Sequence, residues 1–98
     1  MDNIKKRALD LLALRDHGCV ELERKLVRKG FSSADANDVC QQLVAAGILN
    51  DLSFSCNYLR ARSSLGYGCL KVKSELIRKG ITAEVISQSF DDCVVDWH

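Results

Sequence analysis

The chain has 98 residues, of which 47% are hydrophobic and 28% charged, and its formal net charge is +1. A chain of this length buries roughly 60–68% of the surface of its unfolded form, which supports a modest core and leaves little room for a deep active-site pocket. No apolar run approaches the roughly 18 residues that cross a bilayer, and the basic start contains acids and no small-residue cleavage site. We therefore expect a cytoplasmic protein without a signal peptide.

Apolar residues recur at helical spacing along the whole chain, and no segment alternates with the period of two that is typical of strands. The clearest stripe contains Ala36, Val39, Cys40, Leu43 and Val44, which follow the spacing i, i+3, i+4, i+7, i+8. Proline is absent, and single glycines separate the stripes. We predict six helices, over residues 3–15, 18–29, 33–46, 51–64, 68–79 and 83–95.

Residues at the ends of these segments agree with the helix assignment. Gly30 and Gly80 each follow a basic turn, where a helix commonly ends on a residue in the left-handed conformation. The cations before them are favourable near the negative end of the helix dipole. Ser32 or Ser33 can cap the third helix, and Thr82 can cap the sixth.

The two halves of the chain align without gaps after a shift of 50 residues. Residues 26–32 (LVRKGFS) then meet residues 76–82 (LIRKGIT), and Gly18-Cys19 meets Gly68-Cys69. Such self-similarity indicates a tandem repeat of units that are each too small to be very stable alone. We predict an all-α protein of two three-helix units, residues 1–48 and 49–98, arranged as an elongated or curved rod.

The small net charge hides an uneven distribution along the chain. Residues 1–30 have a net charge of +3 and residues 31–50 a net charge of −2. The second half repeats this pattern, with +4 over residues 51–80 and −4 over residues 81–98. Each predicted unit therefore has a basic first pair of helices and an acidic third helix.

The five cysteines form no C-x-x-C pair, and only two histidines accompany them. This set does not resemble a zinc site, so we expect no metal and no cofactor. Buried free thiols behave as small hydrophobic side chains. We predict that the cysteines are reduced and mostly buried, with Cys19 and Cys69 in equivalent core positions because each begins an i, i+3, i+7 stripe.

Basic residues concentrate on the predicted second, fourth and fifth helices. One interpretation is a solvated face with weak helix pairs such as Glu21–Lys25 and Glu75–Lys79. The other is a surface for an acidic protein or a nucleic-acid backbone. Because the helix pairs leave several cations without local acids, we name candidate partner-binding residues in the second unit. They are Arg60, Arg62, Tyr67, Lys71, Lys73 and Arg78.

The aromatic residues do not interleave with the arginines as they would on a platform that stacks single-stranded bases. We expect Phe54, Tyr58 and Phe90 in the core, whereas Tyr67, between two glycines, could be exposed or packed. The chain has no G-x-S-x-G motif and no phosphate-binding glycine loop, so we predict that it is not an enzyme. An acidic third helix also disfavours a DNA-reading helix-turn-helix.

Six motifs resemble the RecX family of RecA regulators, in the family's order and over nearly the whole chain. They are LLALRDH at 11–17, ELERKL at 21–26, GILND at 47–51 followed by Phe54, YLRAR at 58–62, GYG at 66–68 and ELIRKGI at 75–81. Asp96-Trp97 is similar to the family's lead-in to a further helical unit. Leu52 and Cys69 depart from the family pattern, which commonly has an acid and a proline there.

The resemblance implies a monomeric regulator that binds RecA recombinase or its filament on single-stranded DNA. Such proteins inhibit ATP hydrolysis, strand exchange and filament growth during DNA repair and the SOS response. The chain ends at His98, where the family's third unit usually begins, so the resemblance implies a shortened chain or a naturally short relative. The alternative is a helical protein that acts directly on DNA, with weak binding to single-stranded or duplex DNA.

Overall fold

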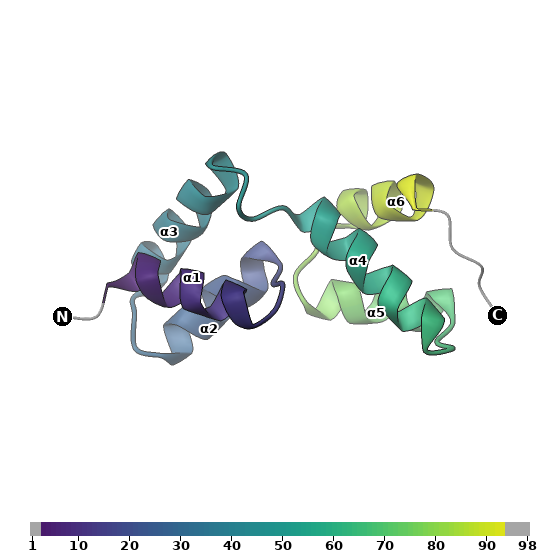
Figure 1. The fold of residues 1–98 in the computed structure, drawn as a ribbon, viewed down its shortest axis with the longest axis horizontal. Coiled ribbons are helices and arrows are strands. Elements are labelled where there is room, and N and C mark those ends of the chain that lie inside the picture. The colour runs from purple at the N-terminus through teal and green to yellow at the C-terminus, as the bar shows by residue number, and fades with distance from the viewer. Residues whose placement is uncertain (1–2, 94–98) are drawn as a thin grey trace. The chain divides into compact units, whose positions relative to one another are not determined.

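The computed structural model describes residues 3–93, and within them the chain is all-helical, as predicted (Figure 1). The helices are α1 (Ile4–Leu14), α2 (Cys19–Arg28), α3 (Ser33–Ala45), α4 (Asp51–Ser64), α5 (Cys69–Arg78) and α6 (Ala83–Asp92). They form two compact units, which we call unit 1 (residues 1–50) and unit 2 (residues 51–98). The first residue of each helix lies within one residue of its predicted position.

Side-chain caps explain where the third helix of each unit begins. The Ser32 hydroxyl accepts a hydrogen bond from the Asp35 N–H at 3.1 Å, so Ser32 rather than Ser33 is the cap of α3. Thr82 caps α6 in the same way, through a 3.3 Å hydrogen bond from the Val85 N–H. Each cap satisfies one of the backbone donors that the first turn of a helix leaves without an intrahelical partner.

The second helix of each unit ends in the same hydrogen-bonded turn. Gly30 has a φ of +104°, and the Phe31 N–H after it donates to the Leu26 carbonyl at 3.2 Å. Gly80 has a φ of +85° and is followed by the matching bond from Ile81. This six-to-one bond is the mark of a Schellman motif, whose positive φ favours glycine. The repeated RKG sequence therefore encodes a repeated helix end.

Each unit encloses its own hydrophobic core. The unit 1 core contains Ala8, Leu22, Leu26, Ala36, Val39, Cys40, Leu43 and Leu49. The unit 2 core contains Phe54, Leu59, Val72, Leu76, Ile81, Ile86 and Cys93. The predicted stripe on α3 is buried apart from Val44, which is 44% exposed. The inclusion of Val44 was wrong because it lies at the edge of the stripe, in the last turn of the helix.

The two units have three equivalent helices each, in the same order, but these helices pack differently. In unit 1 the most extensive helix pair is α2 with α3, whereas in unit 2 it is α4 with α6. In unit 2, α5 packs less extensively on α6 than α4 does. The third helix of unit 2 is therefore held mainly by the first helix of its unit.

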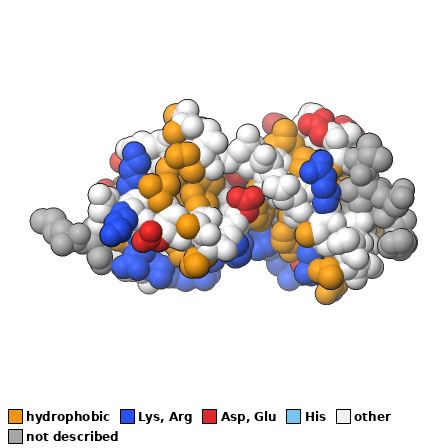
Figure 2. All heavy atoms as spheres, viewed as in Figure 1, with side chains coloured by type: hydrophobic (Ala, Val, Ile, Leu, Met, Phe, Trp, Pro, Cys, Tyr) orange, Lys and Arg blue, Asp and Glu red, His pale blue; other side chains and the backbone are white. Residues whose placement is uncertain are grey.

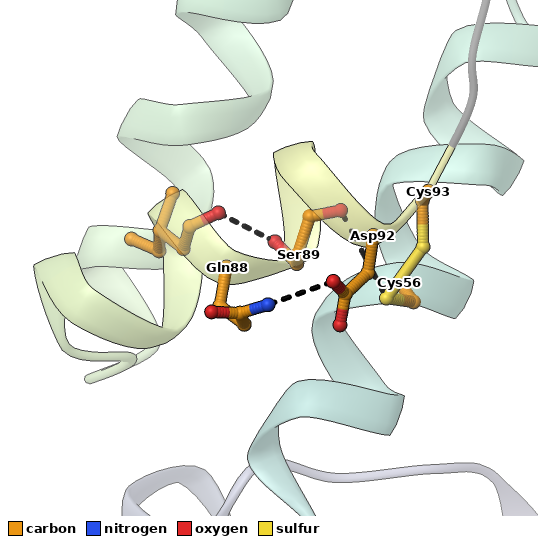
Figure 3. The surroundings of a disulfide bond; sticks show 6 residues. Cys56, Gln88, Ser89, Asp92 and Cys93 are labelled. Atoms are coloured by element: carbon orange, nitrogen blue, oxygen red, sulfur yellow. Dashed lines mark hydrogen bonds between the residues drawn. A yellow bond between two sulfur atoms is a disulfide. The ribbon is translucent and has the colours of Figure 1, made fainter.

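The prediction that all cysteines are reduced was wrong for Cys56 and Cys93, which form a disulfide between α4 and the end of α6 (Figure 3). The two residues are 37 positions apart, so no local pattern pairs them, and only the packing of α4 on α6 brings their Cα atoms to 6.1 Å. Cys40 is buried as predicted. Cys19 and Cys69 do occupy equivalent places, but as first residues of their helices they are half-buried.

Among the aromatic residues, Phe54 is buried as expected, while Tyr58 and Phe90 are half-buried and only flank the core. The prediction that the last helix continues beyond Asp92 was wrong at Cys93, whose backbone is extended; residues 94–95 of that prediction and the Asp96-Trp97 motif lie outside the described residues. Among the helices of residues 3–93, none is long and apolar enough to cross a membrane.

His17 closes the turn between α1 and α2. The ring is 2% exposed; Nδ1 donates to the Arg15 carbonyl at 2.8 Å, and Nε2 accepts from the Lys25 ammonium, also at 2.8 Å. This arrangement requires a neutral imidazole. Burial lowers the pKa of His17 below 6.5, and the positive charges of Lys25 and Arg15 lower it further, although the hydrogen bond to the backbone opposes the shift.

We expect the stability of the protein to fall as the pH is lowered below 6.5, because His17 binds a proton more readily in the unfolded chain than in the folded protein. Urea unfolding followed by circular dichroism, at about pH 7.5 and about pH 5.5, measures this change. In His17→Gln the loss of stability between these two values should be smaller. An equal loss in both proteins would contradict the assignment.

We expect Leu76→Ala to lower the free energy of unfolding by about 2–5 kcal/mol, because it leaves a cavity at a fully buried position. Leu70→Ala is the matched control, since Leu70 lies on the same helix and is 78% exposed. The control should change stability by less than about 0.5 kcal/mol. Similar losses in the two variants would show that the described core is wrong.

Candidate partner-binding surface

Two helix faces of unit 2 meet around one loop tyrosine. Tyr58 and Arg62 lie four residues apart on α4, and Lys71 and Glu75 lie four residues apart on α5. Residues at this spacing share a helix face. Together with Tyr67, between the two helices in the chain, they form what we call the Tyr67 cluster.

Glu75 is the centre of the hydrogen bonds in this cluster. One terminal nitrogen of Arg62, Nη2, donates to both carboxylate oxygens, at 3.0 Å and 3.2 Å. The Tyr58 hydroxyl donates to one of them at 2.7 Å. The carboxylate therefore ties α5 to two successive turns of α4.

The Tyr67 ring is in contact with two cations. The Arg62 guanidinium carbon lies 3.9 Å from the ring centroid, and the Lys71 ammonium nitrogen lies 4.6 Å from it. Both distances are within the roughly 6 Å range of cation–π attraction. Of the two outcomes left open for Tyr67, the structure shows the packed one, with the side chain half-buried.

Protonation follows from the same contacts. Partial burial by itself raises the pKa of Glu75, but hydrogen bonds from Tyr58 and Arg62 and the charges of Arg62 and Lys71 outweigh it, so the pKa falls below 4.5. Desolvation works against the charged form of Arg62, yet Glu75 raises the pKa of Arg62 overall. Both groups therefore stay charged, and the charge of Arg62 is directed inward, toward Glu75.

Arg78 lies beside the cluster on the same side of α5. With Tyr58, Glu75 and Lys79 it lines an open hollow of about 270 Å³. The Lys79 ammonium lies 5.4 Å from the Tyr58 ring centroid. Lys and Arg side chains gather over the α5 side of unit 2 in Figure 2. The hollow thus has an aromatic wall and a basic rim.

The structure does not bring Arg60 and Lys73 into the cluster. Each is two residues from a cluster member, and this offset turns a side chain about 200° around a helix. Arg60 is exposed on α4. The Lys73 ammonium lies 4.9 Å from the Phe90 ring centroid and faces α6. The six candidates named from the sequence therefore lie on more than one face of unit 2.

Sequence reasoning missed three residues of this region: Tyr58, Glu75 and Lys79. Tyr58 was assigned to the core, and Glu75 was treated as a local partner of Lys79. The i, i+4 spacing of Tyr58 and Arg62 was the available signal. The pairing of Glu75 with α4 had no signal in the sequence, because it depends on how α4 and α5 pack.

The charge on the second helix differs between the two units at two equivalent positions. Under the shift of 50 residues, Lys71 corresponds to Glu21 and Lys73 to Glu23. Glu21 forms an ion pair with Arg15, at 2.9 Å. The second helices of the two units therefore share their core and their end but present different charge to a partner.

Two three-helix units in tandem place this chain in the class of small helical-repeat proteins. Residues 5–43 match the first three-helix domain of RecX, and residues 50–89 match its second three-helix domain. The chain belongs to the RecX family.

Similar curated proteins carry the name Regulatory protein RecX. The protein of Pseudomonas putida strain W619 is 34% identical over 94 residues, which are 96% of this chain and 60% of that protein. The protein of Mannheimia succiniciproducens is 36% identical over 91 residues, which are 92% of this chain and 60% of that protein. The chain thus spans about three fifths of the length of these relatives, whose name describes a regulator.

We expect Glu75→Gln to be less stable than the parent at neutral pH, because the charge-assisted bonds to Arg62 and Tyr58 are weakened. The carboxylate contributes to stability only when ionised, so the difference should shrink as the pH falls below 4.5. Urea unfolding across this range measures it. Glu84→Gln, at an exposed position on α6, is the control, and its loss of stability at neutral pH should be smaller than that of Glu75→Gln. A difference that persists in acid would contradict the assignment.

Proposed function

We propose that this chain regulates RecA recombinase by binding RecA or its filament on single-stranded DNA. Binding inhibits ATP hydrolysis, strand exchange and filament growth. Support comes from membership of the RecX family and from the regulator name of the curated relatives. The proposal places the activity in the cytoplasm and requires no catalytic residue in this chain.

The basic face of unit 2 is the observation that carries this proposal. Lys71 and Arg78 are exposed on α5, seven residues apart and so on one side of the helix. Lys71 lies over the Tyr67 ring, which is itself in contact with Arg62. A cation that is already ordered loses less side-chain entropy on binding than a mobile one. We therefore assign Arg62 and Tyr67 to positioning, and Lys71 and Arg78 to contact with an acidic surface.

Direct DNA binding is the competing function, because phosphates are attracted by the same cations. The arrangement of Tyr67 argues against a role in single-strand binding, since a ring in contact with two cations is less available for stacking on a base. Charge alone does not separate a protein partner from DNA. The dependence of binding on RecA and on salt does.

The matched pair Arg78→Glu and Arg28→Glu tests the site. Both residues are exposed and occupy the same position of the repeat, but only Arg78 is beside the Tyr67 cluster. In an ATPase assay of RecA on single-stranded DNA titrated with this chain, Arg78→Glu should weaken inhibition about tenfold or more. Arg28→Glu should stay close to the parent.

Equal effects of the two substitutions would show that the site is not specific to unit 2. If inhibition is unchanged in Arg78→Glu, or in the additional variant Lys71→Glu, this face is only a solvated surface. Lys71→Glu places in unit 2 the residue type that unit 1 has at the equivalent position, Glu21. Circular dichroism of each variant checks that helix content is retained.

Binding measured at two salt concentrations, to bare DNA and to RecA-coated DNA, separates the two functions. Each phosphate contact adds about 0.9 to the slope of log affinity against log salt on duplex DNA, and about 0.7 on single strands. We expect binding that requires RecA and lacks this phosphate dependence. Tight binding to bare DNA with a steep slope would replace the RecA proposal with direct DNA binding.

A further inference from the structure

The third helix of unit 2 has a weaker apolar anchor than its counterpart in unit 1. Helix α3 buries Ala36, Val39, Cys40 and Leu43. Within α6, the buried residues are Ile86 and Ser89. Ser89 replaces Val39 of the repeat, is fully buried, and donates its hydroxyl to the Ile86 carbonyl at 2.7 Å. A hydroxyl bonded within its own helix contributes less to packing than the side chain of valine.

Helix α6 also packs more extensively against one of its neighbouring helices than against the other. Its main neighbour is α4, whereas its contact with α5 is smaller and includes an open hollow of about 320 Å³. Lys73 of α5 and the α6 residues Ile86, Phe90 and Asp91 are among those that line the hollow. The attachment of α6 to unit 2 therefore depends on the α4–α6 contact.

The disulfide lies across this contact. Cys56 belongs to the second turn of α4, and Cys93 is the C-cap of α6 (Figure 3). The Ser89 carbonyl oxygen lies 4.0 Å from Cys56 Sγ, so the bond is next to the buried serine. In the repeat, Cys56 and Cys93 correspond to Lys6 and Leu43. Leu43 is 1% exposed, so the position of the repeat that is a disulfide cysteine in unit 2 is a buried apolar residue in unit 1.

We propose that Cys56–Cys93 is a reversible thiol–disulfide site that controls whether α6 is firmly attached to unit 2. With the bond formed, α6 is covalently linked to α4. With both sulfurs reduced, α6 is held only by its non-covalent packing, in which it buries fewer apolar side chains than α3 does, and it opens more often. Opening α6 removes Phe90 and Asp91 from beside Lys73, so the redox state also decides whether the hollow between α5 and α6 exists.

The exchange partner is a low-molecular-weight disulfide of the glutathione type. The thiolate of Cys56, the more exposed of the pair, attacks one sulfur of that disulfide and releases one small thiol. The Cys93 thiolate then attacks Cys56 Sγ in the mixed disulfide and releases the second small thiol. Two protein thiols are oxidised and one small disulfide is reduced to two thiols, with two protons transferred in total. A small dithiol reduces the bond: one of its thiolates attacks a protein sulfur and releases the other protein thiol, and its second thiolate then displaces the remaining protein thiol and closes a cyclic disulfide.

Thiol counting on the full chain tests whether the site forms and reverses. After equilibration with glutathione disulfide, alkylation of the denatured protein should label three of the five cysteines, namely Cys19, Cys40 and Cys69. After treatment with a dithiol, all five should be labelled. Five labels after oxidation, or peptide mapping that pairs other cysteines, would overturn the site.

Hydrogen exchange tests the effect on α6. Closing a loop of 37 residues restricts the open state strongly, so reduction should speed exchange of the α6 amides by about tenfold or more. The α3 amides serve as the internal reference and should change by less than about twofold. Unchanged protection of α6, or equal changes in α3 and α6, would overturn the proposal.

Two variants make this test independent of the reductant. Cys56→Ser with Cys93→Ser should reproduce the reduced exchange pattern in both oxidising and reducing buffer. Cys69→Ser removes a free thiol from the same unit and should respond to reduction as the parent does. If the double variant fails to fold, exchange of the reduced parent against the oxidised parent still decides the outcome. A response in the double variant equal to that of the parent would overturn the proposal.

Discussion

Size is the constraint on which the rest of this structure depends. A unit of about 50 residues buries a smaller fraction of its surface than a larger domain does and gains little stability from a single core. Each unit therefore has to complete its core with a few well-placed side chains and a tightly closed chain. Leu26 and Leu76, each on the second helix of its unit, are fully buried members of these cores. The Schellman turns that follow them bring Phe31 and Ile81 back onto the same cores.

The two units meet this constraint by different means. In unit 1 the third helix supplies four buried residues, and a neutral histidine closes the first turn. In unit 2 the third helix supplies fewer apolar groups, and a disulfide and a cluster of aromatic, acidic and basic residues add to the packing. Duplicated helices thus allow divergence at the surface and at the helix contacts, while the shared helix end preserves the geometry of each unit.

The same divergence separates structural from partner-facing charge in unit 2. Glu75 directs Arg62 inward, so a residue that reads as surface charge in the sequence stabilises the α4–α5 contact. Tyr67 contacts both Arg62 and Lys71, and so joins the internal ion pair to an exposed cation. In unit 1 the equivalent position is His17, which bonds to Lys25 of the following helix. In both units, the loop between the first two helices therefore carries a ring that contacts a cation.

The sequence by itself determined six helices, the Thr82 cap, the glycine helix ends and the repeat of 50 residues, and it left Ser32 or Ser33 as the cap of the third helix. The helices and their ends follow from spacing and backbone preference within one or two turns, and the repeat follows from comparing the two halves of the chain. The tertiary structure alone decided the disulfide between Cys56 and Cys93, the bond from Arg62 to Glu75 and the separation of Lys73 from the Tyr67 cluster. These features depend on which helix packs against which, and on the angle of each side chain around its helix. Two units with the same order of helices can have different main helix pairs, as α2–α3 and α4–α6 are here. Which helices pack most extensively depends on the volumes of side chains that come into contact only in the folded unit.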